Sequence, residues 1–211
     1  MKGTIKELRD GLTLDIIKYG YPWLLEAEFE DAVIGVKLCD LVWYDGTWNN
    51  GTWCSGVWKN GKWKNGEWCN GDWYFGEWLG GLWHNGIWHH GEWRNGIWHK
   101  GSWRGGNWFN GDWINGNWHD GYWYDGKRRN GKWFDGFWFN GQWIDGVWLN
   151  GVWFDGHWIN GNWYNGEWRN GVWKDGIWYE GEWKGGEWNS GIWHGGTKSN
   201  ASSENIQPNI E

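Results

Sequence analysis

A five-residue unit repeats almost without error from Trp43 to Gly196, and it limits the possible folds more than any other feature. Written from its glycine, the unit is G-x-W-x-[N/D]. Glycine occupies every fifth position from Gly46 to Gly196, 31 times in all. Tryptophan occupies every fifth position from Trp43 to Trp193, except at Arg128, and Asn or Asp precedes 21 of the 31 glycines. Such a period indicates a stacked repeat architecture.

Each unit has the pattern of a short strand followed by a turn. Asn-Gly and Asp-Gly favour turns because both residues tolerate positive φ. A turn every five residues leaves about three extended residues. The side chain of the middle residue, tryptophan, points to one face of this short strand, and those of its two neighbours point to the opposite face. Those neighbours include Lys62, Glu77 and Arg94, which are residue types that are rarely buried. Because soluble proteins do not expose so many indoles, the tryptophans are predicted to form the core.

Two all-β architectures satisfy this pattern. In the first, each unit is one side of a square coil of a β-solenoid, four units close a turn of 20 residues, and the repeats make about 7.75 coils over ~37 Å. In the second, the units are strands of a long β-meander with all tryptophans on one face. That face would need a second layer, and the strands are short for a free sheet. We therefore favour the solenoid.

The unit also resembles known repeats. Its period and size pattern are similar to those of the pentapeptide-repeat proteins, which form a right-handed quadrilateral β-helix with a central inward Leu or Phe and a small inward residue two positions earlier. Here tryptophan and glycine take those places, and the resemblance implies a square coil. Some pentapeptide-repeat proteins mimic DNA, but the 13 basic and 16 acidic residues of positions 41–196 do not make the strongly acidic surface this requires. The G-x-W-x-[N/D] arrays are also similar to tryptophan-glycine repeats of phage proteins, which implies a virion component.

The repeats are flanked by two segments of different character. Residues 1–42 have ordinary globular composition and are predicted to cap the solenoid or anchor it to a partner, because an open end exposes core and strand edge. Within them, Thr4 and Glu7 match a helix capping box, Leu12–Tyr19 fits a helix or a strand, and Ala27–Trp43 is predicted to be extended. Residues 43–196 form the repeat region, and residues 197–211 are a polar C-terminal tail.

Nothing in the chain has the arrangement of a catalytic or metal centre. No nucleophile–base pair or phosphate-binding loop is found. His99 and His119, which a square coil would stack, lack a third ligand partner. We therefore predict no enzymatic activity, no cofactor and no metal.

Composition bears on partners and location. The net charge of −7 disfavours nucleic-acid binding, and no apolar run is long enough for a membrane span. Three cysteines without a signal peptide predict synthesis in a reducing compartment. The final location of the protein is left open, and a virion is one candidate. A square coil would place Cys54 and Cys69 on different faces.

Outward apolar residues between positions 109 and 164 predict a contact surface. In a square coil they would form columns at a spacing of 20, such as Ile114 above Phe134 and Phe154. The candidate interface residues are Ile114, Phe134, Phe137, Phe139, Val152, Phe154 and Ile159. An exposed apolar stripe usually marks an interaction site, for self-association or for docking into an assembly. One alternative is that the rings only stack along the ladder. Another is a carbohydrate-binding groove of Tyr122, Tyr124, Phe137 and Phe139.

A short basic cluster surrounds the position that lacks tryptophan. Lys127, Arg128, Arg129 and Lys132 form a weak candidate for a phosphate or carboxylate contact. Because a lone buried guanidinium is costly, the unit that contains Arg128 is predicted to bulge and release its side chain.

The sequence as a whole predicts a non-enzymatic structural or adaptor protein that makes protein contacts in a larger assembly.

Overall fold

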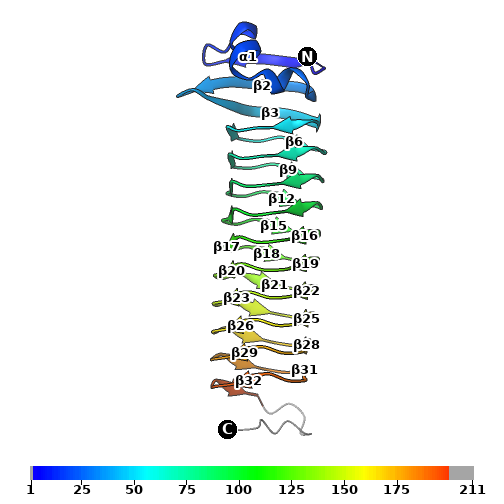
Figure 1. The fold of residues 1–211 in the computed structure, drawn as a ribbon, viewed down its shortest axis with the longest axis vertical. Coiled ribbons are helices and arrows are strands. Elements are labelled where there is room, and N and C mark those ends of the chain that lie inside the picture. The colour runs from blue at the N-terminus through cyan, green and yellow to red at the C-terminus, as the bar shows by residue number, and fades with distance from the viewer. Residues whose placement is uncertain (1, 200–211) are drawn as a thin grey trace.

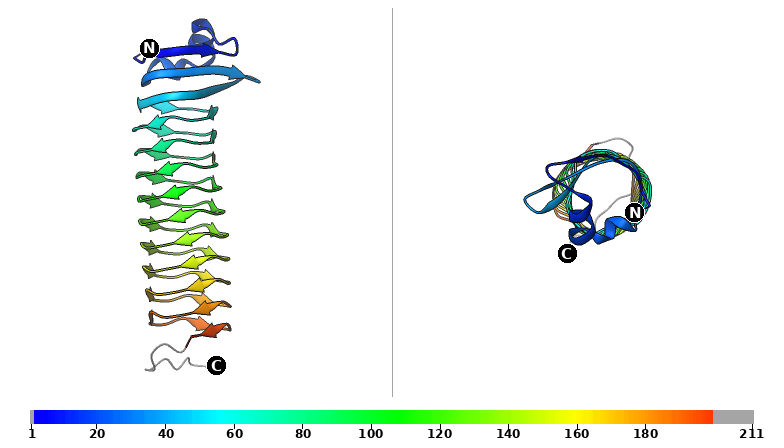
Figure 2. Two further views of the ribbon diagram at one scale, coloured as in Figure 1. Left: turned by 180° about the vertical axis from the view of Figure 1, so that it is seen from behind. Right: turned by 90° about the horizontal axis from the view of Figure 1, so that it is seen from above.

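The computed structural model describes residues 2–199, which form a parallel β-solenoid with a small N-terminal part at one end (Figure 1). Residues 200–211, most of the predicted tail, lie outside the described residues. The predicted solenoid is therefore confirmed, and the meander is not formed. Seen along the axis, successive coils lie almost on top of one another (Figure 2).

Each coil has three sides, not four. Every repeat strand pairs in parallel with the strands three units before and after it, for example Ile87 with Asp72 and with Ser102. A coil is therefore 15 residues long, and the predicted square coil of 20 residues, which the family resemblance also implied, is wrong. The three sides stack into three faces, each of which carries one strand per coil.

The strands of the three faces are as follows. Face 1 consists of β4 (Thr52–Trp53), β7 (Glu67–Trp68), β10 (Leu82–Trp83), β13 (Ile97–Trp98), β16 (Asp112–Trp113), β19 (Lys127–Arg128), β22 (Gln142–Trp143), β25 (His157–Trp158), β28 (Val172–Trp173) and β31 (Glu187–Trp188). Face 2 consists of β5 (Val57–Trp58), β8 (Asp72–Trp73), β11 (Ile87–Trp88), β14 (Ser102–Trp103), β17 (Asn117–Trp118), β20 (Lys132–Trp133), β23 (Val147–Trp148), β26 (Asn162–Trp163), β29 (Ile177–Trp178) and β32 (Ile192–Trp193). Face 3 consists of β6 (Lys62–Trp63), β9 (Glu77–Trp78), β12 (Glu92–Trp93), β15 (Asn107–Trp108), β18 (Tyr122–Trp123), β21 (Phe137–Trp138), β24 (Val152–Trp153), β27 (Glu167–Trp168), β30 (Glu182–Trp183) and β33 (Thr197–Lys198).

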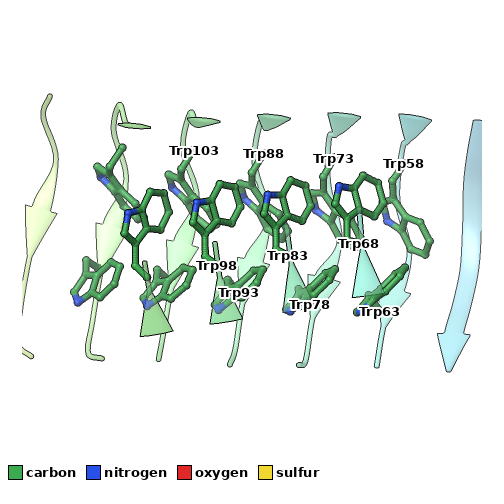
Figure 3. Close-up of a cluster of buried hydrophobic side chains, with 14 of the residues drawn as sticks. Trp58, Trp63, Trp68, Trp73, Trp78, Trp83, Trp88, Trp93, Trp98 and Trp103 are labelled. Carbon is green, nitrogen blue, oxygen red and sulfur yellow. The ribbon is translucent and has the colours of Figure 1, made fainter. Parts of the chain in front are cut away.

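The tryptophans point inward, as predicted, and form three columns along the axis (Figure 3). Each repeat tryptophan from Trp43 to Trp178 is fully buried. Within a coil, consecutive indoles meet edge to face, as Trp73 and Trp78 do with ring centroids 5.9 Å apart at 76°. Between coils they stack, as Trp58 and Trp73 do at 4.7 Å and 6°. Both arrangements are favourable for aromatic rings, and three indoles per coil fill the interior.

The glycine at each corner is required by backbone conformation and by space. At Gly81, φ is +112°, and an added Cβ would lie 2.4 Å from the carbonyl oxygen of Gly66 in the preceding coil. The Asn or Asp before the glycine also supports the corner, since Asp125 Oδ1 accepts a hydrogen bond from the N–H of Gly126 at 2.7 Å. Asn and Asp residues of neighbouring coils pair at the corners as well, as Asn150 and Asp135 do at 3.3 Å. The repeated N-G and D-G dipeptides are thus explained by turn chemistry.

The N-terminal residues cover the first coil. Strand β1 (Ile5–Arg9) pairs in parallel with β2 (Glu28–Lys37), and β2 pairs antiparallel with β3 (Asp40–Asn50), which continues into the solenoid. Between β1 and β2 lie helix α1 (Leu14–Gly20) and the short 3-10 helix η1 (Pro22–Leu25). Within η1, Trp23 packs on Trp53 with ring centroids 5.1 Å apart, so an indole closes this end of the core.

The predictions for this segment are partly confirmed. Ala27–Trp43 is largely extended. Helix α1 overlaps the predicted range Leu12–Tyr19 and ends one residue after it. The helix predicted from the capping box at Thr4 is wrong. The Thr4 hydroxyl instead accepts a hydrogen bond from the N–H of Asp31 at 3.0 Å, which ties the start of β1 to β2.

The adjacent glycines Gly80 and Gly81 test the corner geometry. A Cβ at Gly80 would meet only the carbonyl oxygen of Lys64, at 3.7 Å, which is an ordinary contact. We expect Gly81→Ala to lower the free energy of unfolding by at least about 1–3 kcal/mol, because the strained φ and the steric clash act together. Gly80→Ala should change the free energy of unfolding by less than about 0.5 kcal/mol. Guanidinium unfolding followed by tryptophan fluorescence measures both, and equal effects would contradict this account of the corner.

Candidate functional site

Outward side chains form ladders with a spacing of 15 residues, and this spacing decides which candidates lie together. Phe137, Phe139, Val152 and Phe154 lie side by side on face 3. The other three candidates lie elsewhere: Ile114 and Ile159 follow strands of face 1, and Phe134 follows β20 of face 2. The predicted column of Ile114, Phe134 and Phe154 is therefore wrong, since each belongs to a different face.

Three further residues lie with this group on face 3, and two of them, Tyr122 and Tyr124, belong to the predicted carbohydrate-binding groove. Phe109, Tyr122 and Tyr124 complete two adjacent columns, and we call the seven residues the aromatic strip: Tyr122, Phe137 and Val152 before the tryptophans, and Phe109, Tyr124, Phe139 and Phe154 after them. Tyr122, Tyr124 and Phe137 are exposed, and the other four are half-buried.

The rings of the strip stack on one another along the solenoid axis. Phe109 and Tyr124 lie 5.0 Å apart at 6°, Tyr124 and Phe139 lie 5.1 Å apart at 8°, and Phe139 and Phe154 lie 4.7 Å apart at 15°. In the second column, Tyr122 stacks on Phe137 at 5.2 Å. Because each ring covers the flat faces of its neighbours, the strip offers mainly ring edges to the outside.

Arginine covers both ends of the longer column. The guanidinium of Arg94 lies 4.3 Å from the ring centre of Phe109, and that of Arg169 lies 4.4 Å from the ring centre of Phe154. These distances are typical of cation–π contacts. The column on face 3 therefore runs without interruption from Arg94 through four aromatic rings to Arg169.

Glutamates hold both arginines in place. Arg94 pairs with Glu92 at 2.6 Å and with Glu77 at 3.3 Å. At the other end, Arg169 and Lys184 pair with Glu167 at 2.5 and 3.0 Å. Partial burial opposes ionisation of Glu167, but the hydrogen bonds from Lys184 and Arg169 outweigh it and hold the pKa of this carboxyl below its ordinary value. Each end of the strip thus carries a small network of opposite charges.

Cysteine and histidine pairs also follow the 15-residue spacing. Cys54 and Cys69 lie in one column of face 1, contrary to the prediction from a square coil, and both are free thiols. His99 stacks on His84 at 5.1 Å, not on His119, which stacks on Phe134 of face 2 at 4.8 Å. Within residues 2–199, no group of three or more His, Cys, Asp or Glu side chains is placed to hold a metal ion.

The basic cluster does not converge. Lys127 and Arg129 point outward from face 1, Lys132 points outward from face 2, and Arg128 points into the core. The predicted bulge is wrong, because β19 keeps its register with Trp113 on one side and Trp143 on the other. Arg128 is fully buried, and its three side-chain nitrogens have no hydrogen-bond partner within the described chain.

The guanidinium of Arg128 takes the place of an indole between two others. Its central carbon lies 4.1 Å from the ring centre of Trp143 and 5.8 Å from that of Trp113. Burial lowers the pKa of Arg128 to about 9, so the side chain still carries its charge at neutral pH. The cation–π contacts offset part of the desolvation cost, and the in-register neighbours hold the chain in place.

Arg128 is therefore a weak point of the core that can be repaired. We expect Arg128→Trp to raise the free energy of unfolding by about 1–4 kcal/mol, because it replaces a desolvated charge with the ring that fits the column. Arg129→Gln removes one charge from the exposed neighbouring residue, and this control should stay within about 0.5 kcal/mol of the parent. Denaturant midpoints measure the difference, and a destabilised Arg128→Trp variant would show that the guanidinium is required.

The shape of the chain agrees with a structural or interaction role. A rigid β-solenoid with its core filled by indoles offers long, regular outer faces. The helices of residues 2–199 are all too short to cross a membrane. Comparison of the chain with protein-family models gives no match, and comparison with curated proteins gives none either.

Proposed function

We propose that the protein is a non-enzymatic structural or adaptor element, a stiff rod that makes protein contacts in a larger assembly, and that this assembly is a phage virion. The observation that carries the proposal is the aromatic strip on face 3, an apolar surface built on a rigid frame and bordered by paired charges. The similarity of the repeats to tryptophan-glycine arrays of phage proteins supports the choice of a virion.

The rod is suited to this role because its stiffness comes from the core. Adjacent coils are joined by backbone hydrogen bonds on all three sides, such as Tyr124 N–H to the carbonyl oxygen of Trp108 at 2.8 Å, and by stacked indoles inside. Residues on one face therefore keep their spacing when a partner binds, so little conformational entropy is lost on binding.

Carbohydrate binding is the second candidate for the same residues. A sugar ring packs against the flat face of an aromatic ring, but in the longer column these faces are covered by neighbouring rings or by Arg94 and Arg169. In the shorter column, Tyr122 and Phe137 each cover one face of the other. The exposed ring edges are better suited to contact with apolar and polar side chains of a protein. We therefore favour a protein partner over a glycan.

Cross-linking in the native source tests the proposal. We expect cross-links from the full chain to a protein component present in stoichiometric amount, identified by mass spectrometry. The variant Phe137→Ser/Phe139→Ser/Phe154→Ser should lose them, because its apolar contact area is removed. The matched variant on face 1, Ile114→Ser/Ile144→Ser/Ile159→Ser, should keep them.

Three outcomes would contradict the proposal. A chain that yields no stoichiometric protein cross-links in its native source would not be an assembly component. If the face 1 variant loses the contacts and the face 3 variant keeps them, then the interface lies on face 1. Saturable binding of a glycan that disappears in the face 3 variant would support the second candidate instead.

A further inference from the structure

The charges on face 3 are ordered, and the order differs between its two outward columns. The column before the tryptophans carries Glu77 and Glu92 on one side of the aromatic strip and Glu167 and Glu182 on the other. The column after the tryptophans carries Arg94 on the first side and Arg169 and Lys184 on the second. In the rows that border the strip, one column is thus acidic at both ends and the adjacent column is basic at both ends. Leu79 lies beside Glu77, and in the next row outward Lys62 and Lys64 are both basic, with Lys62 pairing with Glu77 at 3.1 Å.

We propose that face 3 binds face 3 of a second copy of this chain, with the two rods side by side and pointing in the same direction. This inference names the partner of the face described above, and it rests on that face being a contact surface, as the proposed function requires.

A two-fold axis parallel to the solenoid axis places the acidic column of one copy opposite the basic column of the other, at the same level along the rod. Glu92 then faces Arg94 of the second copy, Glu167 faces Arg169, and Glu182 faces Lys184. Within one copy these residues already pair, as Arg94 does with Glu92 and Lys184 with Glu182. In the dimer each basic group lies between two carboxylates.

The antiparallel arrangement is disfavoured by the same charges. A two-fold axis perpendicular to the rod, centred on the strip, places each column opposite itself in reverse order. Glu92 would then face Glu167, and Arg94 would face Arg169. Like charges in an interface oppose association and exclude wrong arrangements, so the order of charges selects the parallel dimer.

The aromatic strip supplies the apolar centre of this interface. In the parallel dimer, Tyr122 faces Tyr124 of the second copy, Phe137 faces Phe139, and Val152 faces Phe154. Both copies have the same spacing between rows, 4.7–5.2 Å along the stacked rings, so every row of one copy meets a row of the other. A partner without this spacing could not match all rows, which favours a second copy over an unrelated protein.

The length of the contact is adequate for a specific dimer. The charged and aromatic rows from Glu77 to Glu182 span seven steps of ~4.8 Å, or roughly 34 Å. The apolar rows lie in the middle and the charged rows at the ends, which is the usual arrangement of an apolar interface core with a polar rim.

Sedimentation of the purified full chain, with the natural cysteines intact and reduced, tests the dimer. We expect the mass to rise with concentration from the 25.0 kDa of one chain to twice that value. Arg94→Glu/Arg169→Glu makes both columns acidic in the two charged rows that border the strip, at positions 92 and 94 and at positions 167 and 169, and should raise the dissociation constant about tenfold or more. The matched control Arg129→Glu/Lys174→Glu makes the same change of charge on exposed residues of face 1 and should have little effect.

A mixing experiment separates loss of charge complementarity from loss of folding. Glu92→Arg/Glu167→Arg makes both columns basic in the same two rows and should also weaken self-association. Mixing this basic variant with the acidic variant restores opposite charges in both halves of the interface, so a mixed dimer should form. A chain that stays monomeric up to about 200 μM, a concentration that corresponds to a binding free energy of only about −5 kcal/mol, would overturn the proposal. Variants that dimerise like the parent would overturn it as well.

Pulsed electron paramagnetic resonance determines the orientation. The spin label is placed at Asn65→Cys, an exposed corner position, with Cys39, Cys54 and Cys69 replaced by serine. In the parallel dimer the two labels lie at the same level, whereas in the antiparallel dimer they lie roughly 40 Å apart along the axis by strand spacing. The longer distance would contradict the parallel dimer. A monomeric chain that still shows cross-links to a different protein in its native source would overturn the dimer and leave the proposed function standing.

Discussion

The close approach of corner glycines between coils is the constraint on which the rest of the structure depends. At Gly116, φ is +125°, and a Cβ would lie 2.5 Å from the carbonyl oxygen of Gly101. The same geometry recurs at every corner from Gly61 to Gly196, so the backbone can turn every five residues and still stack in register. Only then do the indoles come within stacking distance, and they in turn exclude water from the backbone ladders. Glycine and tryptophan are therefore needed together, and neither would form this core alone.

Outward positions are free of this constraint, but they are not independent of one another. Each outward side chain lies beside the residue 15 positions away, so stacking on neighbours along the ladder decides how it is oriented. Face 2 shows this with Lys59, which lies 3.6 Å from the ring centre of Tyr74, and with Tyr74, which stacks on His89 at 4.2 Å. Face 3 uses the same effect over a longer run. The aromatic strip is thus rigid because of its own stacking as well as because of the core beneath it.

The sequence was sufficient to predict the unit, the inward tryptophans and the solenoid, because turn chemistry and the size of the indole determine them. It did not determine the number of sides, since a five-residue unit closes equally well into a triangle or a square. The analogy with smaller inward Leu and Phe favoured four sides, whereas three indoles already fill the interior. A signal was present, because the pairs Cys54 and Cys69, and His84 and His99, are spaced by 15. Arg128 was mispredicted because in-register ladders on both sides outweigh the cost of one buried charge.

Three sides per coil also restrict how the chain can vary. A unit inserted or deleted within the repeats would leave the core pattern intact, but it would move all later outward residues to the next face. Such a change between Phe109 and Val152 would divide the aromatic strip between two faces and separate the two charged ends. The glycine and tryptophan pattern alone tolerates any number of units, whereas a continuous face 3 tolerates changes only in multiples of three. The surface that we assign to protein contact therefore places a stricter condition on the sequence than the fold does.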